Sequence, residues 1–301
     1  MLNIIKASTS LGSNNKGTEK APELLLKGGL IEALNFNKIQ YQILTLPKNN
    51  KGREEQIKKN TLVKNHLELT AYNHLIYNLA TTHQGSTDKL LLLGGDHSVG
   101  IGSMFATKTI EPETVLLYID AHPDSNTPET SLSHNMHGMS LATVLGDSLH
   151  RDYKFPIYNY KEVIILGAKD IDPLEWKYIK DKKIKIYTMS DIITEGIGTI
   201  IKDILKFIST KPLHVSLDID SIDTEYAPGT GVINKGGLSY REIKYIAEKI
   251  STRDIRTIDL VEVNPKYDKN NKTVLLGIEL ILTLLGGKWS PYEKYIEKSK
   301  N

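Results

Sequence analysis

The stretch Val115-Leu116-Leu117-Tyr118-Ile119-Asp120-Ala121-His122-Pro123-Asp124 passes within ten residues from apolar side chains to ionisable ones. Its first half is a continuous apolar and aromatic run, which is typical of a strand buried on both faces of a parallel sheet. Asp120, His122 and Asp124 then follow at two-residue spacing, and alternate side chains of an extended chain point the same way. The stretch therefore predicts a buried strand whose carboxyl end directs two carboxylates and an imidazole to one point.

Similar apolar runs recur along the chain between segments of helical periodicity. We predict further strands at Leu90–Leu93, Val163–Leu166, Ile184–Tyr187, Leu213–Leu217 and Ile255–Val263, and less strongly near Leu2–Ile5 and Ile39–Leu44. Apolar residues at three- and four-residue spacing predict helices at Ala21–Leu34, Ile200–Ile208, Tyr240–Ile250 and Val274–Leu285. This alternation predicts an α/β fold in which helices cover both faces of a mainly parallel sheet. Because no stretch has the composition of a linker, we predict one domain over residues 1–301.

The composition excludes several classes of protein. The 301 residues include 38 basic and 36 acidic ones, a balance without the positive charge expected for binding nucleic acid or an anionic membrane. The absence of cysteine excludes disulfides, thiolate metal sites and cysteine nucleophiles. No apolar run approaches the roughly 20 residues needed to span a bilayer, and the N-terminus lacks a secretory apolar region. We therefore expect a cytoplasmic protein, with the lysine-rich segment Lys48–Lys64 as a solvated loop and helix start.

Three other predicted strands also end in ionisable residues. The runs are Leu91-Leu92-Leu93-Gly94-Gly95-Asp96-His97-Ser98, Ser216-Leu217-Asp218-Ile219-Asp220-Ser221-Ile222-Asp223 and Asp259-Leu260-Val261-Glu262-Val263-Asn264-Pro265. In open parallel sheets, binding sites form at the carboxyl ends of the strands. We therefore expect these runs to meet the Asp120–Asp124 segment at one edge of the sheet.

The charge of this cluster predicts two metal ions. Asp120, Asp124, Asp218 and Asp220 would bring four negative charges together, and no lysine or arginine lies in the four runs. Unpaired buried carboxylates are very costly, whereas two divalent cations would neutralise all four. We therefore predict a two-metal site with the ions about 3.5–4 Å apart. Oxygen and nitrogen ligands without sulfur suit manganese, with cobalt, iron or zinc as alternatives.

At these residues the chain resembles the ureohydrolase family and, within it, the arginases. The resemblance begins at Lys16-Gly17-Thr18-Glu19-Lys20-Ala21-Pro22, continues through Gly-Gly-Asp-His-Ser, Asp-Ala-His-Pro-Asp and Ser-Leu-Asp-Ile-Asp, and ends at Glu-Val-Asn-Pro. It implies a three-layer α/β/α sandwich that assembles as a homotrimer or homohexamer. The implied reaction is hydrolysis of L-arginine to L-ornithine and urea by a hydroxide that bridges two manganese ions.

The resemblance also implies a role for each site residue. One ion would be held by His97, Asp120, Asp124 and Asp218, and the other by Asp120, His122, Asp218 and Asp220. Catalytic roles fall to Asp220, which passes on a proton, to His137 as a proton shuttle, and to Glu262 as the partner of the guanidinium group. A carboxylate suits that last role because it matches the forked N–H donors of a planar cation.

The loop from Ser125 to Gly138 looks like that of the arginases rather than the agmatinases. By this resemblance Asn126 and Ser133 bind the substrate α-carboxylate, while Asp172, supported by Glu175, binds the α-amino group. His134 has no counterpart, and we expect it to be an exposed loop residue.

Two departures and three alternatives accompany this interpretation. Thr224 replaces a proline, and Val232 stands where arginases often carry threonine near the guanidinium pocket. An agmatinase or guanidinobutyrase would keep the metal ligands and change the contacts to the far end of the substrate. A deacetylase of the same fold normally uses one zinc ion and fewer carboxylates. A non-catalytic metal-binding relative would typically have lost ligands, whereas all are present here.

Overall fold

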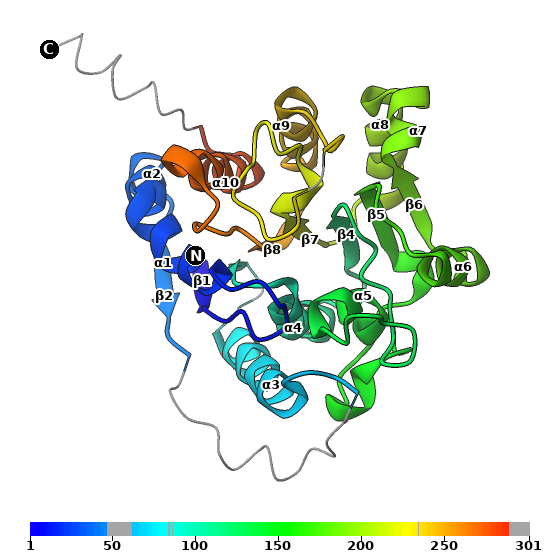
Figure 1. Cartoon of the computed structure of the whole chain (residues 1–301). Coiled ribbons are helices and arrows are strands. Elements are labelled where there is room, and N and C mark those ends of the chain that lie inside the picture. The colour runs from blue at the N-terminus through cyan, green and yellow to red at the C-terminus, as the bar shows by residue number, and fades with distance from the viewer. Residues whose placement is uncertain (47–61, 84, 86, 234, 289–301) are drawn as a thin grey trace, which may run out of the picture.

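The computed structural model describes residues 1–46, 62–83, 85, 87–233 and 235–288. At its centre lies one sheet of eight strands in the order β2-β1-β3-β8-β7-β4-β5-β6 (Figure 1). The strands are β1 (Leu2–Ala7), β2 (Tyr41–Leu44), β3 (Lys89–Gly94), β4 (Val115–Ile119), β5 (Val163–Ala168), β6 (Lys185–Thr188), β7 (Leu213–Asp218) and β8 (Ile255–Val261). All neighbouring strands run parallel, which confirms the predicted mainly parallel sheet.

Helices cover both faces of the sheet, as the alternation of elements predicts. One face packs against α1 (Ala21–Leu25), α2 (Ile31–Phe36), α7 (Met189–Glu195), α8 (Ile197–Ile208), α9 (Tyr240–Ile250) and α10 (Lys272–Leu284). The other face packs against α3 (His66–His83), α4 (Gly100–Ile110), α5 (Ser140–Val144) and α6 (Pro173–Lys182). Alternate residues of a strand serve the two faces, because Leu91 and Leu93 pack toward α1 while Leu90 and Leu92 pack toward α3 and α4. The fold is a three-layer α/β/α sandwich.

The predicted helix Ala21–Leu34 departs from a single regular helix. A wider π-helical turn at Leu26–Leu30 joins the regular α-helical turns of α1 and α2, and within it Gly29 adopts φ 128°. A glycine accepts this backbone conformation at little cost, so the chain bends there. Pro22 lies in the first turn of this helix, and the Thr18 side chain does not cap it. Instead the Glu19 carboxylate accepts a hydrogen bond from Gly17 N at 2.7 Å.

The order of the strands brings the four sequence runs together. β3, β8, β7 and β4 are neighbours in the sheet, although they come from positions 89 to 261 of the chain. Since all four run in the same direction, their carboxyl ends meet at one edge. Within the described ranges, no helix is long and apolar enough to cross a membrane. Residues 48–61 of the Lys48–Lys64 segment lie outside the described residues.

Candidate metal centre

The predicted ligands do converge at the carboxyl edge of the sheet, but through turns rather than through strand alternation. β4 ends at Ile119, so Asp120, His122 and Asp124 lie beyond the strand, and Asp124 has a backbone φ of 47°. Asp218 is the last residue of β7, and Asp220 lies in the 3-10 turn that follows. That turn is closed by a hydrogen bond from Asp220 N to Asp218 Oδ1 at 2.8 Å.

His97, directly after β3, faces three of the predicted carboxylates. Its Nδ1 lies 3.0 Å from Asp120 Oδ2, 3.2 Å from Asp124 Oδ2 and 3.2 Å from Asp218 Oδ2. The other ring nitrogen, Nε2, lies 2.9 Å from the hydroxyl of Ser216. With Nε2 bonded to that hydroxyl, Nδ1 is the nitrogen directed at the carboxylates. A metal-binding imidazole is usually fixed in this way by a partner on its second nitrogen.

His122 forms a second group next to the first. Its Nδ1 lies 3.1 Å from Asp220 Oδ2 and 3.5 Å from Asp120 Oδ1. Two sets of ligand atoms are therefore close enough to hold a metal ion, namely His97 with Asp120 and Asp124, and Asp120 with His122 and Asp220. Asp120 belongs to both and turns one oxygen toward each histidine. This is the arrangement expected of a carboxylate shared by two ions.

The cluster has the electrostatics of a cation site. Asp120 Oδ2 is buried and accepts no hydrogen bond among the described residues, and its 3.0 Å contact with His97 lacks hydrogen-bond geometry. Burial, together with the charges of Asp124 and Asp220, raises the pKa of Asp120 to about 6. Burial alone would lower the pKa of His97, but the carboxylates around it raise that pKa well above its usual value. The chain therefore provides an excess of negative charge that divalent ions would offset, and the residues fit a two-metal centre.

Glu262 stands beside this cluster in an unusual backbone conformation. It follows β8 with φ 59°, a left-handed value that is uncommon for residues other than glycine. The conformation is held by a hydrogen bond from Glu262 N to Gly95 O at 2.8 Å. Asp124, with φ 47°, shares the left-handed backbone. Such strained positions concentrate at functional sites, where the surrounding structure maintains them.

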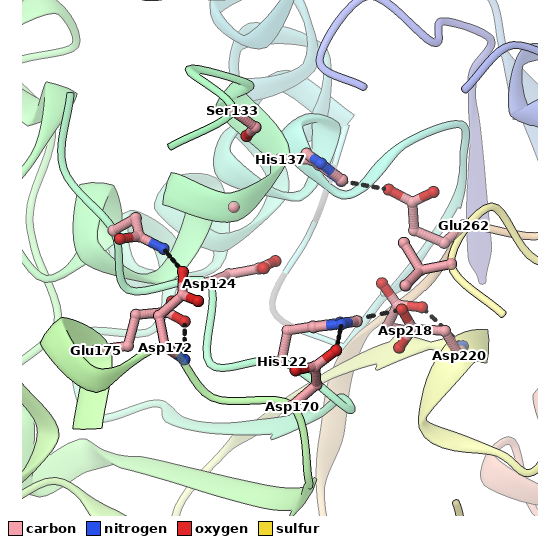
Figure 2. A pocket seen from close by; sticks show the side chains of 13 residues that line it. His122, Asp124, Ser133, His137, Asp170, Asp172, Glu175, Asp218, Asp220 and Glu262 are labelled. Carbon is pink, nitrogen blue, oxygen red and sulfur yellow. Dashed lines mark hydrogen bonds and ion pairs between the residues drawn. The ribbon is translucent and has the colours of Figure 1, made fainter. Parts of the chain in front are cut away.

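The Glu262 carboxylate is buried and pairs with His137. Its Oε1 accepts a hydrogen bond from His97 N at 3.0 Å. The same oxygen accepts a second hydrogen bond from His137 Nδ1 at 3.1 Å (Figure 2). Burial lowers the pKa of His137, but the bond to Glu262 outweighs burial and raises this pKa to about 9. His137 therefore carries a proton at neutral pH while remaining outside the group of metal ligands.

The far side of the pocket carries the residues predicted to bind an amino acid. A cavity of about 220 Å³ is lined by His122, Asp124, Asn126, Ser133, His137, Gly138, Asp170, Asp172, Glu175, Asp218, Asp220, Val232 and Glu262. Every predicted site residue lines it except His97 and Asp120, which are buried beneath it. In Figure 2, Asp172 and Glu175 lie across the pocket from Glu262.

Glu175 acts on this far side through its neighbours. Its two carboxylate oxygens accept hydrogen bonds from Ser125 N at 2.8 Å and from Asp172 N at 3.2 Å. Asn126 Nδ2 in turn donates to Asp172 Oδ2 at 3.3 Å. Burial raises the pKa of Glu175 to about 7, although the backbone hydrogen bonds lower it in part. The buried carboxyl group thus ties the Asp124–Asn126 loop to the start of α6.

Sequence reasoning missed several residues of the site. Asp170 lines the pocket, and its Oδ2 lies 3.7 Å from His122 Nε2. The sequence signal for Asp170 was its position two residues before the predicted site residue Asp172. Ser216 and Tyr118 contact His97 from within strands, where the sequence marks them only as core positions. His134 is half-buried, so its prediction as an exposed residue was wrong.

A parallel α/β/α sandwich with a buried histidine–aspartate cluster at its carboxyl edge indicates a metal-dependent hydrolase. A model of the arginase family matches residues 2–286 of the chain. The arginase of Bacillus subtilis is 35% identical over 294 residues, covering 95% of this chain and 98% of that protein. Arginase-1 of Rattus norvegicus is 32% identical over 323 residues, covering 99% and 98%. The crystal structure of Entamoeba histolytica arginase in complex with L-ornithine has a TM-score of 0.86 at 28% identity, covering 95% of this chain and 97% of that one.

The chain therefore belongs to the arginase family, whose members are metallohydrolases acting on linear amidines.

Proposed function

We propose that this protein hydrolyses L-arginine to L-ornithine and urea with two manganese ions. The observation that carries the proposal is the polarity of one pocket. A buried carboxylate, Glu262, lies at the metal cluster, and polar groups suited to an amino acid lie across from it. The arginases among the relatives, and the Entamoeba structure in complex with L-ornithine, support the same substrate.

In this proposal Glu262 orients the guanidinium group. Both of its hydrogen bonds end on Oε1, so among the described residues Oε2 remains for the substrate. A guanidinium group pairs with a carboxylate through charge-assisted N–H bonds, and a buried carboxylate strengthens the pairing. The substrate carbon would then face Asp220 and the other carboxylates that line the pocket.

The proton transfers fall to Asp220 and His137. When bound, two divalent ions would supply the Lewis acidity that makes water a nucleophile near neutral pH. Asp220 lines the pocket and can accept a proton as water attacks the guanidinium carbon. Breaking the C–N bond then requires a proton on the departing amine of ornithine. His137, held as a cation by Glu262 with its side chain 22% exposed, can deliver that proton and recover one from solvent.

The far end of the pocket favours arginine over agmatine. Asn126 and Ser133 can donate hydrogen bonds to an α-carboxylate, and Asp172 can accept from an α-ammonium group. Agmatine lacks the carboxylate, so these donors would be left unpaired. Each hydrogen bond to a charged group contributes about 1.5–3 kcal/mol, so the loss of two corresponds to roughly two to four powers of ten in catalytic efficiency.

Urea release provides the test. The purified protein, loaded with manganese, would be incubated separately with L-arginine, agmatine and guanidinobutyrate, and kcat/KM would be compared. We expect arginine to exceed both other compounds by at least a hundredfold. Equal or faster hydrolysis of agmatine would make the protein an agmatinase. Absence of urea from all three, with both ions bound, would favour a non-catalytic relative. Assembly as a homotrimer or homohexamer and a cytoplasmic location stay predictions.

A further inference from the structure

Tyr118 reaches the metal centre from inside the sheet. It lies on β4, two residues before Asp120, and is fully buried. Its hydroxyl donates to Asp124 Oδ2 at 2.8 Å and lies 3.2 Å from His97 Nδ1. Its ring stacks on the His97 imidazole with centroids 4.7 Å apart and an angle of 2° between the planes. One side chain thus contacts two of the residues assigned to the first metal ion.

We propose that Tyr118 is a positioning residue of the metal centre, which donates a hydrogen bond to Asp124 and supports His97 without binding an ion itself. The inference rests on the metal centre of the proposed function and extends it by one residue. A tyrosine at this position of a buried strand would otherwise be attributed to core packing alone.

The surroundings of the hydroxyl make it a donor and not a ligand. Three carboxylates, those of Asp120, Asp124 and Asp218, surround the same His97 nitrogen that the phenol approaches. A phenol has a single O–H to donate, and the Tyr118 hydroxyl lies at hydrogen-bond distance, 2.8 Å, from Asp124 Oδ2. The phenol therefore serves as a hydrogen-bond donor to the Asp124 carboxylate.

Asp124 needs such a partner more than the other carboxylates do. Backbone N–H groups hold the other carboxylates, since Asp120 accepts from His122 N, and Asp218 from Asp220 N. Among the described residues, the Tyr118 hydroxyl is the hydrogen-bond donor recorded for the Asp124 carboxylate, whose backbone is also left-handed. Removing outer partners of metal ligands typically lowers metal affinity about 10- to 100-fold. We expect a loss of that size for the ion held by His97 and Asp124.

The test compares Tyr118→Phe with Tyr158→Phe. Tyr158 is a matched control because it is also fully buried and donates a hydrogen bond, to Met104 O at 3.1 Å, but within the described part of the chain it forms no hydrogen bond or ring contact with a predicted ligand. Free Mn²⁺ would be followed by electron paramagnetic resonance during titration of each folded protein, without substrate. In Tyr118→Phe, one of two binding steps should weaken about 10- to 100-fold while the other changes less than about threefold. Tyr158→Phe should match the wild type in both steps.

A double-mutant cycle shows whether Tyr118 acts through Asp124. In an Asp124→Asn background, adding Tyr118→Phe should weaken binding much less than it does in the wild type, because coupled residues are not additive. Unchanged affinity in Tyr118→Phe, an equal loss in Tyr158→Phe, or full additivity with Asp124→Asn would overturn the proposal. If the wild type binds one ion only, the two-metal part of the proposed function fails, while the Tyr118 comparison is made on that ion.

A measurement on the wild type keeps the proposal falsifiable if Tyr118→Phe does not fold. A tyrosine that binds a metal ion as phenolate changes its ultraviolet absorption. We therefore expect no tyrosinate band in the difference spectrum as Mn²⁺ is titrated to saturation. The same titration of Tyr158→Phe serves as the control. A band corresponding to one tyrosinate per chain that persists in Tyr158→Phe would indicate a tyrosine ligand other than Tyr158 and would overturn the donor role of Tyr118.

Discussion

Replacing Glu262 by glutamine removes the charge at the guanidinium end of the pocket while nearly preserving its shape. The amide oxygen of glutamine can still accept the hydrogen bond that Oε1 receives from His97 N at 3.0 Å. The turn after β8 should therefore persist, because it depends on Glu262 N and Gly95 O. Loss of activity in Glu262→Gln would then report on charge and not on misfolding.

The expected loss follows from the burial of this carboxylate, which is 3% exposed. Removing one partner of a buried charge pair costs about 2–5 kcal/mol. At about 1.4 kcal/mol per tenfold, kcat/KM for L-arginine should fall roughly 30-fold to several thousandfold. The pKa of His137 should fall as well, because the bond to Glu262 raises it from 6.5 to about 9 against the effect of burial. The limb of the pH–rate profile that depends on protonated His137 should therefore move to lower pH.

The assay is urea release across pH 6 to 10, together with metal content and thermal unfolding of both proteins. An unchanged kcat/KM in a protein that retains its metal would refute the reasoning, because the guanidinium would then bind elsewhere. If kcat/KM falls but the pH profile does not move, the pairing of Glu262 with the substrate guanidinium group is supported. The effect of Glu262 on the pKa of His137 is then refuted.

Three further predictions concern the metal ions and His137. Chelation should abolish activity and manganese restore it, with two equivalents found by metal analysis; one tightly bound ion in the fully active protein would contradict the four-carboxylate charge count. His137→Ala should lower turnover at unchanged metal content, since His137 lies outside the ligand group, and loss of one equivalent would make it a ligand. Because folding raises the pKa of His137 to about 9, its ion pair stabilises the protein fully below pH 6.5 and not above pH 9. The difference in unfolding free energy between wild type and His137→Ala should accordingly shrink as the pH rises through this range; a constant difference would argue against the pairing.

The sheet was predictable from the sequence because its strands are buried on both faces. Continuous apolar runs such as Val115–Ile119 and Leu213–Leu217 therefore mark them directly. The first nine residues of α4, Gly100–Lys108, are all buried. The sequence of this helix therefore lacks an amphipathic period, which is why α4 was not predicted. The bend at Gly29 was missed because a glycine within a helical pattern does not by itself distinguish a regular turn from a kink.

Within the site, residue identity was predictable and local geometry was not. Asp124 and Glu262 were found through their positions after strands, yet their left-handed backbones depend on contacts from elsewhere, such as Gly95 O for Glu262. Tyr118 was missed because its neighbours mark it as a core residue, and only the packing of β4 against the loop after β3 brings its hydroxyl to His97. Tertiary contacts that join distant segments determine both features.

The strand order also constrains how the protein is made. β7 and β8 come last in the chain but insert between β3 and β4. Each of β3 and β4 therefore has one unpaired edge until residues 213–261 are in place. Exposed edges of apolar strands invite pairing with other chains, and such non-local pairing folds slowly. During synthesis the nascent chain is therefore most prone to aggregate after β6 has emerged and before β8 arrives. Since Asp218 and Asp220 arrive with β7, capture of a full set of metal ions would mark the end of folding rather than its beginning.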